Sequence, residues 1–121
     1  MRKLSWFLAC TILILALPLS AKPAFSGTYS IKGMNPGVGP YTGTLTISPR
    51  GDIYDVIWVI GTLKYGGVGV ANGDTLSVAY TGTDKSFIGV MSYTPRANGL
   101  DGKWAIYGGG TKPGTETATR K

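Results

Sequence analysis

From residue 22 onward, the chain consists of short runs in which apolar and polar residues alternate, without helical periodicity. Tyr, Val, Ile and Thr fill these runs, and Gly, Pro, Asn and Asp separate them at short intervals. Alternation with period two indicates strands that bury one face, and many short strands with turn residues between them indicate an all-β sandwich or barrel. The eight expected strands lie at 26–33, 40–48, 53–60, 63–71, 75–81, 86–93, 100–107 and 114–120.

Two turn sequences predict how the central strands pair. Gly61-Thr62 is typical of a type II′ turn, with Gly first, and Asn72-Gly73 is typical of a type I′ turn, in which both central residues take positive φ. The expected partners are Ile60 with Leu63, Trp58 with Tyr65 and Tyr54 with Gly69 for the first turn, and Ala71 with Asp74 and Tyr65 with Tyr80 for the second. Both turns place Tyr65 on the same face, so the two registers agree.

The same logic extends to the outer hairpins. The expected partners there are Ile47 with Tyr54, Tyr93 with Leu100, Met91 with Gly102, Gly89 with Trp104, Ile31 with Tyr41 and Tyr29 with Gly43. Large inward residues therefore repeatedly oppose glycine, which leaves room for a ring and lets a sheet bend sharply.

This pattern predicts a small eight-stranded antiparallel up-and-down barrel, because closure also removes exposed strand edges. Such a barrel resembles the calycin-like barrels in fold. A β-sandwich is the alternative. A membrane barrel is disfavoured because it needs an apolar outer band, whereas the outward positions of 41–48 are hydroxyl residues. They are Thr42, Thr44, Thr46 and Ser48.

The first 21 residues have the pattern of a secretory signal peptide. Arg2 and Lys3 precede an almost wholly apolar run from Leu4 to Leu19, and Ser20-Ala21 offers small residues for cleavage. We expect a signal peptide at 1–21, a single barrel domain at 22–121 and export to the periplasm or the medium. No membrane span is expected after cleavage, and an uncleaved N-terminal anchor is the alternative.

Composition bears on which functions are open to the chain. It has no His, so it cannot build a Ser-His-Asp catalytic unit or offer imidazole to a metal. The acids, Glu116 among them, are interpreted as solvated groups with no pair facing one cleft. The net charge of +6 is spread along the chain, which does not favour a nucleic-acid surface. We therefore expect no enzyme, no metal, no cofactor and no nucleic-acid partner.

An inward aromatic set is the first candidate site. The predicted registers bring Trp58, Tyr65 and Tyr80 side by side on adjacent strands, and Trp104 has the same character. These rings could form the wall of a small apolar or aromatic ligand's pocket, with Tyr hydroxyls as polar contacts. They could equally be a filled core, since an eight-stranded barrel has little spare volume.

An outward apolar set is the second candidate site. Ile57 and Val59 face outward on one strand, and Val68 and Val70 face outward on the next. A soluble monomer usually avoids a wide exposed apolar patch. These residues could therefore serve self-association or a protein partner, unless another segment covers them.

Several stretches resemble a family of small exported bacterial proteins that are commonly labelled fibronectin-binding proteins. They are GTYSIKGMNP at 27–36, YTGT at 41–44, NGDTL at 72–76, GVMSY at 89–93, LDGKW at 100–104 and GTET at 114–117. The resemblance implies no catalytic residues and implies adhesion to a host matrix protein. Some members carry a cysteine pair at what correspond to Tyr54 and Gly69. The first strand also loosely resembles the Gly-x-Trp start of lipocalin and avidin-like barrels, with Tyr29 in place of Trp.

The sequence thus leads to two functional hypotheses. The first is an exported, non-enzymatic protein that binds a small apolar or aromatic ligand inside the barrel. The alternative is a surface adhesin or protein-interaction module that acts through the outer apolar strands.

Overall fold

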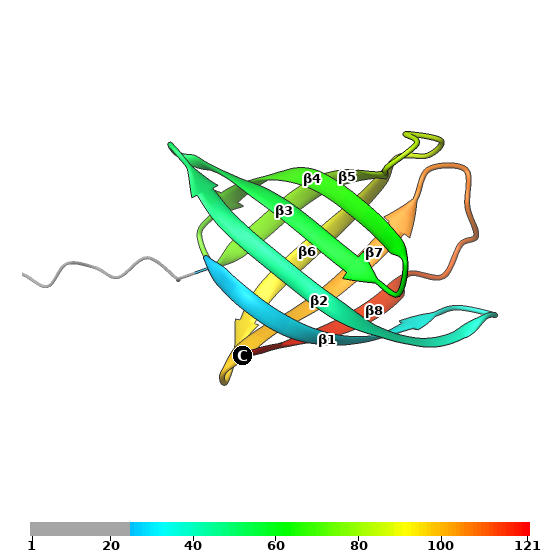
Figure 1. The fold of residues 1–121 in the computed structure, drawn as a ribbon, viewed down its shortest axis with the longest axis horizontal. Helices are drawn as coiled ribbons and strands as arrows, with labels where there is room; N and C mark the ends of the chain where they lie inside the picture. Colours follow the sequence, from blue (N-terminus) through cyan, green and yellow to red (C-terminus); the bar gives the residue numbers. More distant parts are fainter. Residues whose placement is uncertain (1–24) are drawn as a thin grey trace, which may run out of the picture.

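Eight antiparallel strands form one closed barrel, in which each strand pairs with the next and β1 pairs with β8 (Figure 1). The computed structural model describes residues 25–121, so the expected signal peptide lies outside the described residues. The strands are β1 (Gly27–Asn35), β2 (Gly39–Arg50), β3 (Ile53–Ile60), β4 (Leu63–Asn72), β5 (Thr75–Gly82), β6 (Gly89–Arg96), β7 (Gly99–Ile106) and β8 (Gly114–Arg120). The predicted all-β eight-stranded barrel is confirmed, and the sandwich alternative is wrong.

The sixth strand is displaced most from its predicted position. It begins at Gly89 rather than at residue 86, because a turn occupies the preceding residues. Lys85 has a positive φ of 58° and donates its backbone N–H to the Gly82 carbonyl at 2.9 Å. The Asp84 carboxylate accepts the Ser86 N–H at 3.0 Å, which is a typical Asx turn.

The Gly61-Thr62 turn is confirmed, since Ile60 pairs with Leu63 and Trp58 pairs with Tyr65. The predicted Asn72-Gly73 turn is wrong, because the turn lies one residue later and each pairing partner therefore changes by two residues. Asn72 pairs with Thr75, so the turn is Gly73-Asp74. Gly73 has a φ of 65°, and neither of its neighbours has positive φ, so glycine occupies the first central position as type II′ turns require.

In the outer hairpins, each residue also pairs with a partner two positions away from the predicted one. The pairs found are Ile47 with Val56, Tyr93 with Gly102, Met91 with Trp104, Gly89 with Ile106, Ile31 with Gly43 and Tyr29 with Leu45. A shift by an even number keeps every side chain on its predicted face, because the side-chain period of a strand is two. The side chains that were predicted to face inward or outward therefore do so, although the predicted registers were wrong.

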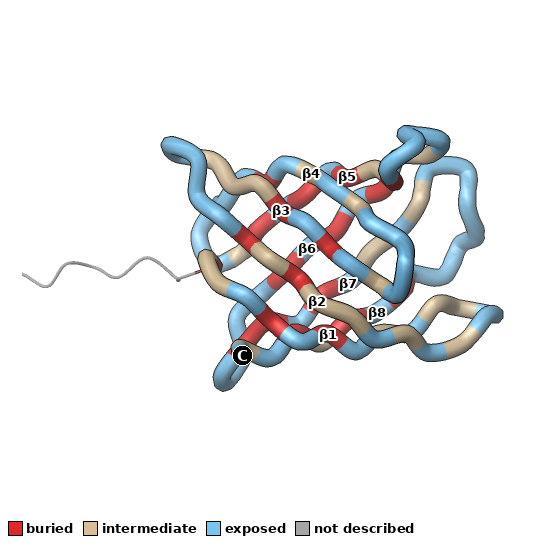
Figure 2. Tube along the Cα trace, in the orientation of Figure 1, coloured by how far each residue is buried: buried red, intermediate tan, exposed pale blue. Residues whose placement is uncertain are grey.

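The barrel interior is filled by large side chains that lie over glycines of neighbouring strands. Tyr93, which is fully buried, opposes Gly102, and a Cβ at Gly102 would lie only 2.7 Å from the Tyr93 ring. Buried and exposed positions alternate along the strands, as Figure 2 shows. The expectation that large inward residues oppose glycine is therefore confirmed in the observed registers.

One end of the barrel is closed by Phe25, whose side chain is 1% exposed. Its ring meets that of Tyr54 edge-on at 6.0 Å, and its carbonyl accepts the Tyr29 hydroxyl at 2.6 Å. The Arg120 guanidinium covers the Tyr29 ring at 4.9 Å and donates to the Ser26 carbonyl. This packing leaves the opposite end of the barrel for a cavity.

No helix within residues 25–121 is long and apolar enough to span a membrane.

Candidate functional site

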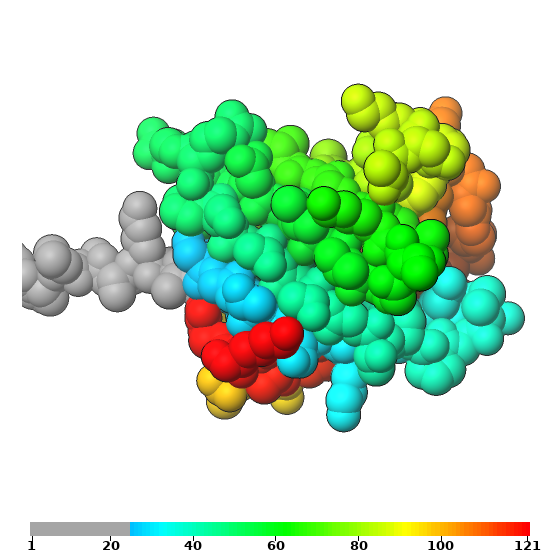
Figure 3. Space-filling model, viewed as in Figure 1, coloured from blue at the N-terminus to red at the C-terminus, as the bar shows by residue number. Residues whose placement is uncertain are grey.

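A cavity of about 250 Å³ opens at the barrel end that lies away from Phe25. The β1–β2 hairpin and the β3–β4 turn border it, at the end where the β5–β6 and β7–β8 loops also project (Figures 1 and 3). Its lining residues are Asn35, Val38, Gly39, Pro40, Tyr41, Trp58, Ile60, Leu63, Tyr65, Tyr80, Met91, Trp104 and Glu116.

The four aromatic residues predicted as a ligand-binding set, Trp58, Tyr65, Tyr80 and Trp104, all line this cavity. The Trp58 and Tyr80 ring centroids lie 5.1 Å apart, and those of Tyr65 and Tyr80 lie 6.4 Å apart. Trp58 and Tyr80 are buried core residues, whereas Tyr65 and Trp104 are half-buried. The four rings therefore include both buried core residues and half-buried residues of the cavity wall.

Phe87, on the β5–β6 loop, joins this cluster from outside the strands. Its ring lies 5.9 Å from that of Tyr65 and 6.0 Å from that of Tyr80. The loop thus lays an aromatic ring against two side chains of the cavity wall.

Glu116, on β8, is 3% exposed and lines the cavity, so its interpretation as a solvated acid is wrong. Its Oε1 accepts the Tyr41 hydroxyl at 2.8 Å, and its Oε2 accepts the Tyr93 hydroxyl. The Trp58 indole N–H is shared between Oε2 at 3.3 Å and the Tyr93 hydroxyl oxygen at 2.9 Å. Three donors from three strands therefore meet on one carboxylate.

Glycines on both flanking strands make this arrangement possible. Glu116 pairs with Gly33 on one side and with Gly102 on the other. Tyr41 is the partner of Gly33 across β1–β2, and Tyr93 is the partner of Gly102 across β6–β7. Each tyrosine thus reaches over a residue without a side chain to the carboxylate.

Trp104 extends the network toward the cavity wall. Its indole N–H donates to the Tyr41 hydroxyl oxygen at 3.0 Å, while that hydroxyl donates to Glu116. The chain of donors polarises each member toward the carboxylate. Two predicted site residues, Trp58 and Trp104, are therefore held in place by an acid that the sequence analysis did not single out.

Burial sets the protonation behaviour of this network. It raises the pKa of Glu116 above its ordinary value, against the opposing effect of hydrogen bonds from Tyr93, Tyr41 and Trp58. Burial, reinforced by the Glu116 charge, raises the pKa of Tyr80 to about 12 and raises the pKa of Tyr93 well above its usual range. The tyrosines therefore stay neutral donors while Glu116 titrates.

The raised pKa predicts a pH-dependent stability. The folded protein holds the Glu116 proton more tightly than the unfolded chain, whose ordinary carboxyl pKa is 4.5. The contribution of this group to stability is thus fully present below 4.5 and is lost as the pH rises through the folded value. We expect wild type to lose stability relative to Glu116→Gln over that rise, by about 1.4 kcal/mol for each unit of pKa elevation. Urea unfolding at a series of pH values measures this difference, and a difference that grows in favour of wild type would contradict it.

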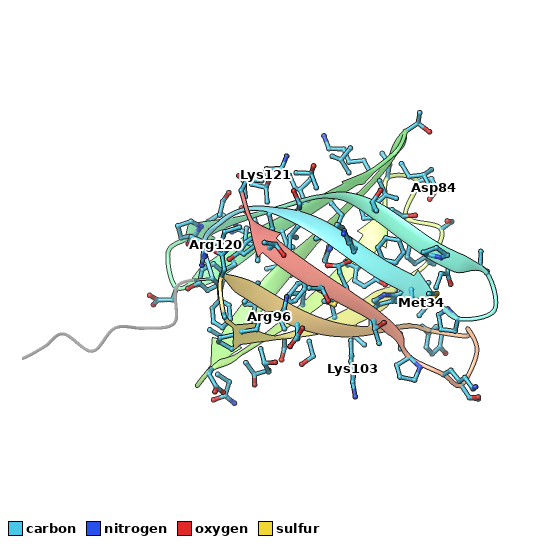
Figure 4. All side chains as sticks on the ribbon, turned by 90° about the horizontal axis from the view of Figure 1, so that it is seen from below. Met34, Asp84, Arg96, Lys103, Arg120 and Lys121 are labelled. Atoms are coloured by element: carbon cyan, nitrogen blue, oxygen red, sulfur yellow. The ribbon has the colours of Figure 1, made fainter. Side chains whose placement is uncertain are left out.

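The predicted interface residues Ile57, Val59, Val68 and Val70 all face outward and are 41%, 43%, 41% and 56% exposed. A shallow outer groove of about 510 Å³ runs past Val68 and Val70 and reaches Val90 on β6. Lys103, which points away from the barrel in Figure 4, borders the groove. The two predicted sites thus lie on opposite faces of the barrel wall, and Trp104 lines both the cavity and the outer groove.

Sequence reasoning missed Tyr41, Phe87 and Glu116. One signal was present for Glu116, because the β8 strand alternates small or acidic residues with threonines. The threonines at 115, 117 and 119 take the outer face, which leaves Glu116 inside. Among residues 25–121, no three His, Cys, Asp or Glu side chains gather in a way that could hold a metal ion.

No family model and no curated protein matches this chain. In structure, the chain is similar to a redesigned β barrel, with a TM-score of 0.69 and 18% identity over 80% of this chain and 91% of that one. It is also similar to EF1p2_mFAP2b bound to DFHBI, with a TM-score of 0.60 and 18% identity over 80% and 94% of the two chains. A third similar structure is the REP1-NXSQ fatty acid transporter, with a TM-score of 0.54 and 13% identity over 79% and 95%.

At these identities the similarity shows a shared fold. It agrees with the looser resemblance of the first strand to lipocalin and avidin-like barrels, which concerns the fold. The resemblance to proteins labelled fibronectin-binding gains no support from the family comparison.

Proposed function

We propose that this protein is an exported, non-enzymatic binding protein that holds a small apolar or aromatic ligand in the open end of its barrel. The cavity of about 250 Å³ carries the proposal, because five of its lining residues are aromatic and most of the others are apolar. Concave, mostly apolar sites with a few placed polar groups are typical of small-molecule binding.

The size of the cavity favours a small ligand. Its 250 Å³ falls just below the roughly 300–1,000 Å³ of sites for drug-sized molecules. Two barrels of similar structure are described as bound to DFHBI and as a fatty acid transporter. These descriptions support the idea that a barrel of this shape can hold a small organic molecule.

The non-enzymatic part of the proposal rests on the chemistry of the lining. Glu116 is the single acid among the residues that line the cavity, and its oxygens are already bonded to three donors. Glycoside hydrolysis, for comparison, requires two carboxyl groups across one cleft. Export rests on the N-terminal sequence pattern, and either the periplasm or the medium is its destination.

Native mass spectrometry of the protein, exported through its own N-terminal segment and purified without detergent, tests export and occupancy together. We expect the mass of residues 22–121, with a small-molecule adduct. A mass that retains residues 1–21 would contradict cleavage.

Replacing a wall residue tests the cavity itself, with indole as the probe. Tyr65→Ala is expected to weaken indole binding by about 1 kcal/mol, a roughly fivefold higher Kd, because it removes one ring from the wall. Tyr107→Ala is the matched control, since Tyr107 is 88% exposed and is not among the residues that line the cavity. Calorimetric titration measures both variants. Unchanged indole affinity in Tyr65→Ala, or equal loss in both variants, would contradict the proposed site.

The outer apolar face supports a second candidate function. Its exposed Ile57, Val59, Val68 and Val70 would dock a second copy or a protein partner, including a matrix protein of the fibronectin type that the resemblance implies. Val70→Lys is expected to dissociate such an assembly. Sedimentation that shows an unchanged monomer for wild type and variant would exclude self-association.

A further inference from the structure

The residues that line the cavity include one carboxylic acid and no basic side chain. Its lining includes Glu116 but neither Lys nor Arg. The ion pairs found within residues 25–121 are Arg50–Asp55 and Arg96–Asp101, both on the surface. The buried carboxylate therefore has hydrogen-bond donors around it but no positive charge paired with it in the described part of the chain.

The donors around Glu116 match the ionised form of the acid. Tyr41, Tyr93 and Trp58 all direct a hydrogen toward its oxygens. An ionised carboxylate only accepts hydrogen bonds, whereas a protonated one must donate one of its own. The network thus fixes the orientation of a negative charge at the base of the cavity.

The aromatic rings add to this negative character. Besides the carboxylate, the lining includes Tyr41, Tyr65, Tyr80, Trp58 and Trp104. The faces of such rings carry negative electrostatic potential, and they attract ammonium groups within about 6 Å of the ring centroid. A buried charge without a counter-ion is unfavourable, and a bound cation would offset that cost.

We propose that the ligand carries a small ammonium group, primary or methylated, which sits among these rings and faces Glu116. This inference rests on the proposed function and names the chemical class of its ligand. A small apolar molecule with one cationic end satisfies both the aliphatic rim, where Val38, Ile60 and Leu63 lie, and the acid beneath it.

A matched pair of probes tests the charge at constant shape. Choline and 3,3-dimethylbutan-1-ol differ in one atom, a quaternary nitrogen against a quaternary carbon, so only the first is a cation. We expect the Kd of choline for wild type to be at least about tenfold lower than the Kd of 3,3-dimethylbutan-1-ol. Glu116→Gln is expected to remove this preference. Asp101→Asn is the control, because it deletes an exposed acid on the outer face of β7 and should leave the preference intact.

The outcomes separate the two proposals. If the neutral alcohol binds as well as choline, or if 3,3-dimethylbutanoate binds better, the ammonium inference is overturned and a binding cavity remains. If indole and all three probes fail to bind wild type, the proposed function fails as well.

A second measurement keeps the inference testable if Glu116→Gln does not fold. The charge of choline does not titrate, so any pH dependence of its binding comes from the protein. Glu116 faces Tyr41 on β2, Tyr80 on β5 and Tyr93 on β6, all with raised pKa, and it faces Gly33 and Gly102 on the flanking strands. We expect choline affinity to fall as the pH is lowered from about 8 to about 4, because Glu116 takes up its proton. Unchanged affinity over this range in folded protein would overturn the inference.

Discussion

Replacing Trp58 with alanine is expected to lower the free energy of unfolding by about 3–5 kcal/mol. Trp58 is 3% exposed, packs on Tyr80 at 5.1 Å and donates its indole N–H to Tyr93. The substitution therefore opens a large void in the core and removes one of the three donors to Glu116. In a domain of this size, the melting temperature should fall by about 12 °C or more.

Thermal and urea unfolding followed by far-UV circular dichroism measures this loss without relying on tryptophan emission. Tyr107→Ala, at an 88% exposed position, is the control and should change stability by no more than about 0.5 kcal/mol. A Trp58→Ala protein as stable as this control would show that Trp58 belongs to an adaptable pocket wall and not to the packed core.

Replacing Gly102 with valine is expected to lower the free energy of unfolding by about 1–3 kcal/mol or more. Even the first added carbon would lie 2.7 Å from the Tyr93 ring and 2.9 Å from the Met91 sulfur. Tyr93 is fully buried and cannot move aside without leaving Glu116. The substitution should therefore disturb the packing and the hydrogen-bond network together.

Gly66→Val provides the matched control for this prediction. Gly66 lies on the outer face of β4, and a Cβ there would meet nothing within 4 Å. Because valine favours extended strands, this variant should be at least as stable as wild type. Urea unfolding compares the two variants. Equal destabilisation would mean that Gly102 is needed for its backbone freedom and not for the room that it leaves to the Tyr93 ring.

The sequence predicted which side chains face inward, but among the predicted strand registers only that of β3 with β4 was correct. Alternation with period two is local, so it assigned Trp58 and Val68 to opposite faces. Pairing depends on each turn, and Gly73 shows why the prediction failed. Asn-Gly was interpreted with glycine second, whereas the chain places glycine first and turns one residue later.

The aromatic wall was predictable for the same reason, since inward rings on adjacent strands must meet near the axis of a small barrel. Glu116 was not, because burial of an acid depends on donors from other strands. Tyr41 and Tyr93 reach it only in the observed registers, over Gly33 and Gly102. A two-residue error in pairing hides that row of five residues completely.

The hydrogen bond from the Lys121 N–H to the Thr28 carbonyl, at 3.0 Å, brings the last residue beside the first strand, at the end that Phe25 closes. A tether or fusion attached after Lys121 would therefore leave from the closed end of the barrel, opposite the cavity. The cavity entrance would then point away from any surface to which the protein is fixed, and it would stay accessible to molecules diffusing in from solution.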